Sequence, residues 1–210
     1  MQASNTGHIY LVDDDASIRE ALASTLERQG FSVTAYASAD EFLKNAAPVS
    51  PAVLLLDMRM PGQNGADLQA DLAQHGWITP IIFLSGESLP AQIVRAMKQG
   101  ASDFLLKPFS MQDLLTTVDQ ALAKDRAIHE VLIKTRTVEK RYVTLTPRER
   151  EVFDAIIAGK TNKQVADEDG SAAATIKLHR SRVLSKMQVD SVADLIALTR
   201  EVDISAIKSK

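Results

Sequence analysis

The chain has 210 residues, of which 45% are hydrophobic and 24% charged, and its formal net charge is -3. This composition is that of a globular protein, and no apolar run approaches the roughly 20 residues of a membrane span, which excludes a membrane protein. The length predicts one domain of about 120 residues and a smaller one of about 65. The sequence has no cysteine and no recognisable signal peptide, so we expect a cytoplasmic protein.

The charge is distributed unevenly along the chain. Residues 1–125 contain 8 Lys and Arg against 15 Asp and Glu, whereas residues 126–210 contain 16 against 12. An acidic first part suits cations, and a basic second part suits phosphate-rich partners. We therefore expect the two parts to bind different ligands.

The first 110 residues alternate short apolar runs with helical patterns. Apolar residues at Ile18, Leu22 and Leu26 have helical spacing, and Gly30 follows where a helix would end. Two of the runs are almost continuously apolar, as expected for parallel strands covered by helices on both faces. The pattern predicts an α/β doubly wound five-stranded parallel sheet, with strands at 8–13, 31–36, 52–57, 80–85 and 103–106.

Residues 109–146 contain neither glycine nor proline. Their near-heptad apolar spacing predicts a fifth helix that continues into a linker helix and pairs with a second subunit. Asp125 interrupts this spacing, and the alternative is a helix that ends near Ala123, followed by a flexible charged linker. The repeating positions are Leu114, Val118, Ala121, Ile128, Leu132, Thr135 and Val138.

After Tyr142 the pattern changes to four short helical segments. Thr146, Pro147 and Glu149 predict the capping box of the first helix. The second and third segments, separated by Gly170, are arranged as a helix-turn-helix. We expect domains at 1–123 and 144–210, joined by a helical linker at 124–143.

Polar residues follow four of the predicted strands. In a doubly wound sheet, strand ends converge where the strand order reverses, and ligands bind there. Any one aspartate could be an ordinary turn former or helix cap, but the joint placement favours a site for Mg2+ and a phosphoryl group, with Asp57 as nucleophile. The residues are Asp13, Asp14, Asp57, Ser85 and Lys107.

These residues lie in the segments VDDD (12–15), LDMRMPGQNG (56–65), LSGES (84–88) and FLLKPF (104–109), which resemble the receiver domain of two-component response regulators over residues 7–123. The resemblance implies a CheY-like fold, Mg2+ (or Mn2+) as cofactor and a histidine kinase as partner. It makes Asp57 the phosphoacceptor, and Asp14, Asp57 and the backbone carbonyl of Arg59 metal ligands. The remaining implied roles are a metal water held by Asp13, a phosphoryl contact by Lys107, room for the phosphoryl group at Gly86, a Ser85 and Phe104 switch pair, and a cis Lys107–Pro108 bond.

No acidic residue lies between Asp169 and Asp190, and the third helical segment is basic. Such a helix suits the major groove of DNA when it is the second helix of a helix-turn-helix. LTPRERE, GKTNKQVA and TIKLHRSRVLSKM resemble the LuxR/FixJ type of DNA-binding domain over residues 144–204. By analogy, the DNA contacts are Asn162, Lys163, Thr175, Lys177, His179, Arg180 and Arg182, and the packing positions are Val165, Ala166, Ile176, Leu178 and Val183.

The predicted turn departs from the family pattern. Asp169 and Ser171 stand where relatives have apolar residues, Ser171 is expected to take over the helix cap, and Ala174 replaces an arginine. Because buried apolar side chains contribute roughly 1.5 to 3 kcal/mol each, we expect a loosely folded domain in the absence of DNA.

The sequence thus predicts a phosphorylation-dependent, dimerising transcription factor that is not an enzyme, with RNA polymerase as a further candidate partner. The alternative is a phosphotransfer or protein-interaction module that no longer binds DNA. A flavodoxin-like enzyme is disfavoured by the acidic loop after the first strand. We also hypothesise that Arg59 and Glu87 meet over Asp57 and slow the loss of phosphate.

Overall fold

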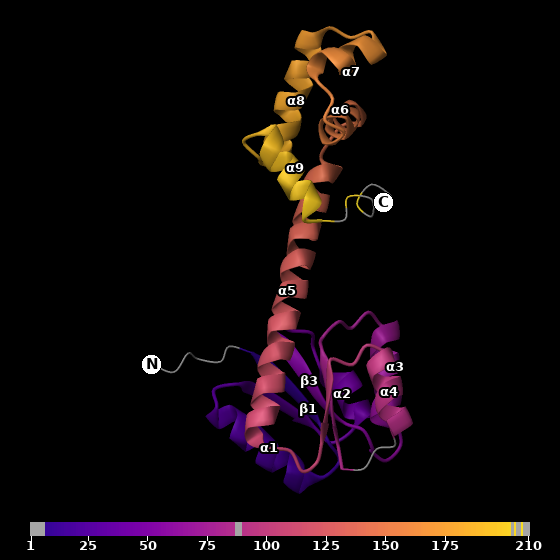
Figure 1. The fold of residues 1–210 in the computed structure, drawn as a ribbon, viewed down its shortest axis with the longest axis vertical. Helices are drawn as coiled ribbons and strands as arrows, with labels where there is room; N and C mark the ends of the chain where they lie inside the picture. Colours follow the sequence, from indigo (N-terminus) through magenta and orange to yellow (C-terminus); the bar gives the residue numbers. More distant parts are fainter. Residues whose placement is uncertain (1–6, 87–89, 203, 205–206, 208–210) are drawn as a thin grey trace. The chain divides into compact units, whose positions relative to one another are not determined.

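The computed structural model describes residues 7–86, 90–202, 204 and 207. The chain divides into two compact units, residues 1–129 and residues 130–210. Helix α5 (Met111–Val143) is continuous across the division and contributes residues to both units (Figure 1). The helical continuation of the last helix is thereby confirmed, and the flexible linker is not found.

The first unit contains a parallel sheet with the strand order β2-β1-β3-β4-β5. Residues His8 to Val12 of the first strand pair with Ser32 to Tyr36 on one side and with Ala52 to Leu56 on the other. The predicted α/β doubly wound fold is confirmed. The strands are β1 (His8–Val12), β2 (Ser32–Tyr36), β3 (Ala52–Asp57), β4 (Ile81–Ser85) and β5 (Asp103–Leu106).

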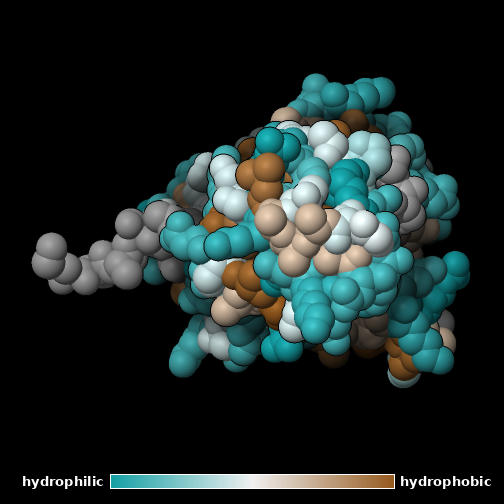
Figure 2. Space-filling model, turned by 90° about the horizontal axis from the view of Figure 1, so that it is seen from above, coloured by the Kyte–Doolittle hydropathy of each residue, from teal (hydrophilic) through white to brown (hydrophobic). Residues whose placement is uncertain are grey.

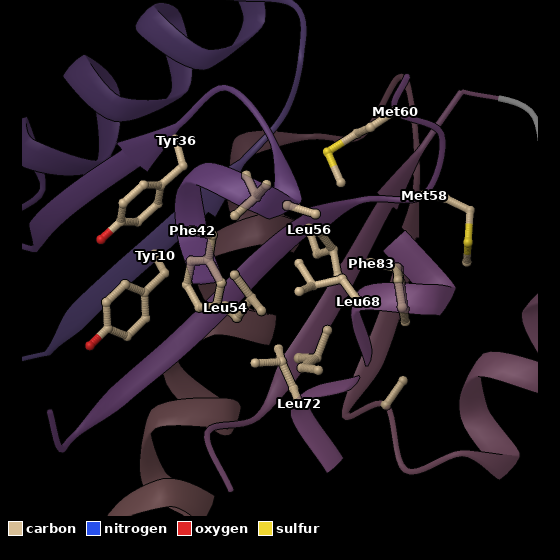
Figure 3. Close-up of a cluster of buried hydrophobic side chains, with 14 of the residues drawn as sticks. Tyr10, Tyr36, Phe42, Leu54, Leu56, Met58, Met60, Leu68, Leu72 and Phe83 are labelled. Carbon is tan, nitrogen blue, oxygen red and sulfur yellow. The ribbon is translucent and has the colours of Figure 1, made fainter. Parts of the chain in front are cut away.

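Helices cover both faces of this sheet and bury alternate residues of its strands. Tyr10, Leu54 and Phe83 belong to a cluster that includes residues of α2, α3 and α4, much of which Figure 3 displays. Leu11 and Leu55, from the opposite face, pack with residues of α1 and α5. The two clusters explain why β3 is apolar along its whole length until Asp57. The helices of this unit other than α5 are α1 (Ala16–Arg28), α2 (Ala39–Asn45), α3 (Gly65–Gln74) and α4 (Pro90–Lys98).

The near-heptad residues of α5 serve the two cores. Leu114, Val118 and Ala121 are buried in the first unit, and Val138 is buried in the second. Residues that are already buried inside a unit are not free to form a seam with another helix. At these positions the predicted pairing of α5 with a helix of a second subunit is therefore wrong. The near-heptad spacing arises there because one face of the helix is buried in the core of its own unit.

Asp125 interrupts the apolar spacing because its carboxylate binds the segment that leads into β3. The residue is fully buried, and its Oδ2 accepts hydrogen bonds of 2.8 Å from Ser50 Oγ and 2.9 Å from the backbone N–H of Ala52. Its Oδ1 lies 3.5 Å from Nδ1 of His129, one turn further along the helix. The contact ties α5 to the first residue of β3, the strand that ends at Asp57.

The second unit is helical in its described part. Tyr142 of α5 packs with Phe153, Val183 and Leu195 from three of the following helices. Thr146 and Glu149 form the expected capping box, with Pro147 as the first helical residue. The helices are α6 (Pro147–Ile157), α7 (Asn162–Asp169), α8 (Ala173–Met187) and α9 (Val192–Arg200).

Apolar surface is limited on the face of the molecule shown in Figure 2. Hydrophilic residues prevail there, and hydrophobic ones occur in small separate groups. Within residues 7–86 and 90–202, no helix combines the length and the apolar character needed to cross a membrane.

Candidate functional site

The sheet brings the predicted polar residues to one edge. Asp57 is the last residue of β3, and Ser85 is the last residue of β4. Asp13 and Lys107 directly follow β1 and β5. Because all the strands are parallel and the order reverses between β1 and β3, these four residues lie at the edge where a doubly wound sheet binds its ligands.

One ammonium group joins two buried carboxylates at this edge. Lys107 Nζ donates hydrogen bonds of 2.8 Å to Asp13 Oδ2 and of 2.8 Å to Asp57 Oδ1. Asp13 is 1% exposed and Asp57 is 7% exposed. Two carboxylates and one ammonium leave a negative charge uncompensated, and Asp14 adds an exposed carboxylate next to Asp13. Since buried charge is unfavourable unless it is paired, the site favours a further cation.

Backbone groups hold the two carboxylates in place. The N–H of Arg59 donates a 2.7 Å hydrogen bond to Asp57 Oδ2, and the N–H of Asp15 donates a 3.0 Å hydrogen bond to Asp13 Oδ1. The carbonyl of Asp13 accepts a 2.7 Å hydrogen bond from Nη1 of Arg19. Asp15 itself caps α1, so the loop that carries Asp13 is fixed by the start of that helix.

Lys107 is a permanent cation in this environment. Burial favours the neutral amine and lowers the pKa of Lys107, but the hydrogen bonds to Asp13 and Asp57 outweigh burial and hold the pKa above its usual value. The peptide bond between Lys107 and Pro108 is cis, as the resemblance implied.

Two glycines shape the space around Asp57. A Cβ on Gly65 would lie 2.4 Å from the backbone oxygen of Asp57, so only glycine fits between this strand end and α3. A Cβ on Gly86 would meet no atom of the described residues within 4 Å, which leaves space beside Ser85 among them. Ser85 is buried, and Phe104 is half-buried with its ring centroid 6.1 Å from that of Phe83.

The second unit contains the predicted helix-turn-helix. α7 ends at Asp169, Gly170 adopts the left-handed conformation with φ of 73°, and α8 begins at Ala173. Gly170 is needed because a side chain would be strained at this φ. Val165, Ala166 and Ile176 pack together, which fixes α7 against α8.

The turn is held by a polar contact from α6. Arg148 donates hydrogen bonds to the carboxylate of Asp169 and, at 3.0 Å, to Ser171 Oγ. The N–H of Ser171 donates a 2.8 Å hydrogen bond to Asp169 Oδ1. We call Arg148, Asp169 and Ser171 the turn clamp.

Comparisons with known proteins agree with both halves of this description. Residues 9–119 match the response regulator receiver domain family, and residues 143–199 match the bacterial regulatory proteins of the luxR family. Nodulation protein W of Bradyrhizobium diazoefficiens is 40% identical over 98% of this chain and 90% of that protein. The transcriptional regulatory protein FixJ of the same species is 35% identical over 91% of this chain and 94% of that protein. The solved structure of the response regulator StyR has a TM-score of 0.84 at 37% identity and covers 93% of this chain and 98% of that chain.

The chain belongs to the two-component response regulators. This response regulator has a receiver domain followed by a LuxR-type DNA-binding domain, and its family regulates transcription rather than catalysing a metabolic reaction. The receiver domain implies a histidine kinase as partner, and the LuxR-type domain implies DNA. These matches do not favour the alternative suggested by the unusual turn, a phosphotransfer or protein-interaction module that no longer binds DNA.

The predicted DNA contacts of the response regulator differ in exposure. Lys163, Thr175, Lys177 and Arg182 are exposed, whereas Asn162, His179 and Arg180 are half-buried. Arg180 Nη1 donates a 2.9 Å hydrogen bond to the carbonyl of Lys160, so part of its guanidinium holds the loop before α7.

Lys186, the last basic residue of α8, is engaged inside the DNA-binding domain. Its Nζ lies 2.6 Å from Glu149 Oε2 and 3.0 Å from the carbonyl of Thr144. The hydrogen bond from Lys186, followed by that from the backbone of Thr146, lowers the pKa of the buried Glu149 carboxyl. This ion pair links α6 to α8.

Two expectations for α8 are corrected. Leu178 is 51% exposed and is not a packing residue, because it lies two positions after the buried Ile176 and thus on the opposite side of the helix. The N-cap of α8 is Ala172, which forms no side-chain cap. Ser171 is one residue too early and belongs to the turn clamp instead. The predicted partner of Arg59, Glu87, lies outside the described residues.

Proposed function

We propose that this response regulator accepts a phosphoryl group on Asp57 from the phosphohistidine of its kinase and thereby controls its own dimerisation and DNA binding. The observation that carries the proposal is the placement of Asp57 at the end of β3, 2.8 Å from Lys107 and beside the buried Asp13. A carboxylate next to a permanent cation suits in-line attack on phosphorus, because the cation neutralises charge on the transferred group.

Mg2+ (or Mn2+) fits the donor set at this edge. Asp13 and Asp57 supply buried carboxylate oxygens whose charge Lys107 only partly compensates. Mg2+ suits such oxygen donors, because it is held by one or two carboxylates and completes its octahedron with water and phosphate oxygens. Asp14, Asp57 and the carbonyl of Arg59 would hold it, with Asp13 on a metal-bound water, and it would neutralise the phosphoryl oxygens.

The residues around Asp57 would then respond to the phosphoryl group. Ser85 and Lys107 donate to its oxygens, and the open space at Gly86 accommodates it. Movement of Ser85 towards the phosphoryl group vacates room for Phe104 to turn inward, which changes the surface near β5. The changed surface favours a second copy of the chain.

DNA is bound mainly through α8, with Asn162 and Lys163 contributed by the start of α7. Lys163, Lys177 and Arg182 neutralise phosphates, and Thr175 contacts the groove, with Asn162, His179 and Arg180 at its margin. Leu178 lies three residues after Thr175 and four before Arg182, so it shares their exposed face and suits contact with a thymine methyl group. Because its proposed partners are DNA, RNA polymerase and a kinase's phosphohistidine, the protein would work in the cytoplasm.

Sizing of the protein with and without beryllofluoride and Mg2+ tests the phosphorylation half of the proposal. We expect the mass to rise from monomer to dimer, and the Asp57→Asn protein to stay unchanged. Equal masses for the unmodified protein in both conditions would contradict phosphorylation-driven dimerisation. A DNA mobility shift whose affinity falls with salt tests the other half, and no shift at low salt in either state would favour an interaction module.

A further inference from the structure

The C-terminus of α7 is an unfavourable place for negative charge. A helix C-terminus carries the negative end of the helix dipole, and cations are preferred there. α7 instead ends in Asp167, Glu168 and Asp169, with no basic residue in its last turn. This arrangement requires compensation from elsewhere in the domain.

The compensation comes from two cations outside α7. Lys160 Nζ lies 2.7 Å from Glu168 Oε2. Arg148, in the first turn of α6, pairs with Asp169 and also with Glu151 at 2.7 Å. The side chains of Arg148 and Asp169 are 33% and 26% exposed, so the pair is partly shielded from solvent. Hydrogen bonds from Arg148, and then from Ser171, lower the pKa of Asp169 to about 2. Asp169 is therefore a fixed negative charge at neutral pH.

That charge lies next to the helix proposed to enter DNA. Only Gly170, Ser171 and Ala172 separate Asp169 from the first residue of α8. Ala172 forms no side-chain cap, so the first N–H groups of α8 have no acceptor from the N-cap side chain. A DNA phosphate approaching these groups would meet Asp169 at short range, and like charges at an interface weaken binding.

We propose that Arg148 is a positioning residue for DNA binding that acts through Asp169 and does not itself touch DNA. It cancels the charge of Asp169, and the same Nη2 that pairs with Asp169 also holds Ser171 and so fixes the turn before α8. The inference rests on the proposed DNA binding by α8. The competing explanation is that Arg148 contacts a DNA phosphate directly.

A double-mutant cycle with a salt titration separates the two explanations. The full-length proteins Arg148→Gln, Asp169→Asn and the double variant are titrated against a random-sequence DNA duplex at several salt concentrations. Arg136→Gln, which removes an exposed arginine from α5, controls for the loss of one positive charge. Circular dichroism checks that each variant is folded.

We expect Arg148→Gln to bind about tenfold more weakly than the unmodified protein, because Asp169 is left unneutralised. The double variant should recover to within about threefold, because its repulsive charge is gone. The slope of log affinity against log salt should stay unchanged in all of them. A slope that falls by about 0.9 in Arg148→Gln, with no recovery in the double variant, would show a direct phosphate contact and overturn the inference.

If Arg148→Gln alone fails to fold, the Asp169→Asn background decides the question. That background has no charge for Arg148 to cancel, so we expect the double variant to bind within about threefold of Asp169→Asn with the same salt slope. A tenfold loss relative to Asp169→Asn, with a slope smaller by about 0.9, would refute charge cancellation. Failure of the unmodified protein to bind DNA at low salt would overturn the proposed function, and the inference with it. Binding without coupling between positions 148 and 169 would overturn the inference alone.

Discussion

Replacement of Asp125 by alanine is expected to destabilise the receiver domain. The substitution leaves the N–H of Ala52 without its acceptor, and Ala52 is fully buried. An unsatisfied buried donor costs about 1 to 3 kcal/mol. Ser50 also loses a 2.8 Å hydrogen bond to a charged group, but its hydroxyl is able to turn to water. Relief of the buried charge offsets part of the loss, so we expect a net decrease of about 2 kcal/mol in the free energy of unfolding.

The single tryptophan makes this change measurable in the full-length protein. Trp77 belongs to the receiver domain, where its ring centroid lies 5.4 Å from that of Phe42, so its fluorescence reports the unfolding of that domain. A loss of about 2 kcal/mol corresponds to a urea midpoint lower by about 1 M. Asp119→Ala removes an exposed aspartate from the same helix and should change stability by less than about 0.5 kcal/mol. If the two variants unfold at the same urea concentration, the anchoring role of Asp125 is refuted.

Three further predictions concern the two sites. Gly65→Ala should lower receiver stability by about 1 to 3 kcal/mol and slow phosphorylation, because the added methyl group collides with the backbone of Asp57; unchanged urea midpoints and rates would contradict this. Lys107→Ala should slow phosphoryl uptake from an acyl phosphate, followed by mass spectrometry, while the protein remains folded; an unaltered rate would count against the role of the ammonium. The pKa of Glu149 is lower in the folded protein than its ordinary value of 4.5, so the ionised carboxylate stabilises the folded state at pH values above 4.5. This stabilisation is lost as the pH falls through the lowered pKa of the folded protein. Thermal unfolding by circular dichroism should therefore show a steeper acid loss of stability in the unmodified protein than in Glu149→Gln, and parallel curves would refute the assignment.

Local sequence determined the helices and strands of this protein and the edge of the sheet at which its polar residues meet. Continuous apolar runs identify the strands, because parallel strands are buried on both faces. Thr146 and Glu149 mark the start of α6, since a capping box needs only residues three positions apart. Asp13, Asp57 and Lys107 were predicted to converge because the ends of parallel strands meet at one edge, and the structure places them within hydrogen-bonding distance.

Contacts between residues far apart in the chain were decided only by the tertiary structure. In the sequence, Asp125 is only a break in an apolar repeat. Its hydrogen bond with Ser50, 75 residues earlier in the chain, explains why an aspartate stands at this position. Leu178 reads as a core residue, but the side of α8 that becomes buried depends on how α6 and α9 pack against it.

The turn before α8 shows the same division between sequence and structure. From the sequence, Asp169 and Ser171 indicate that apolar packing is lost in the turn. The structure shows that Arg148, 21 residues before Asp169, forms hydrogen bonds with both residues in place of that packing. The sequence by itself therefore determined which segments fold and which groups reach the strand ends. The tertiary structure decided which polar residues are anchors, because their partners are brought together only when the helices pack.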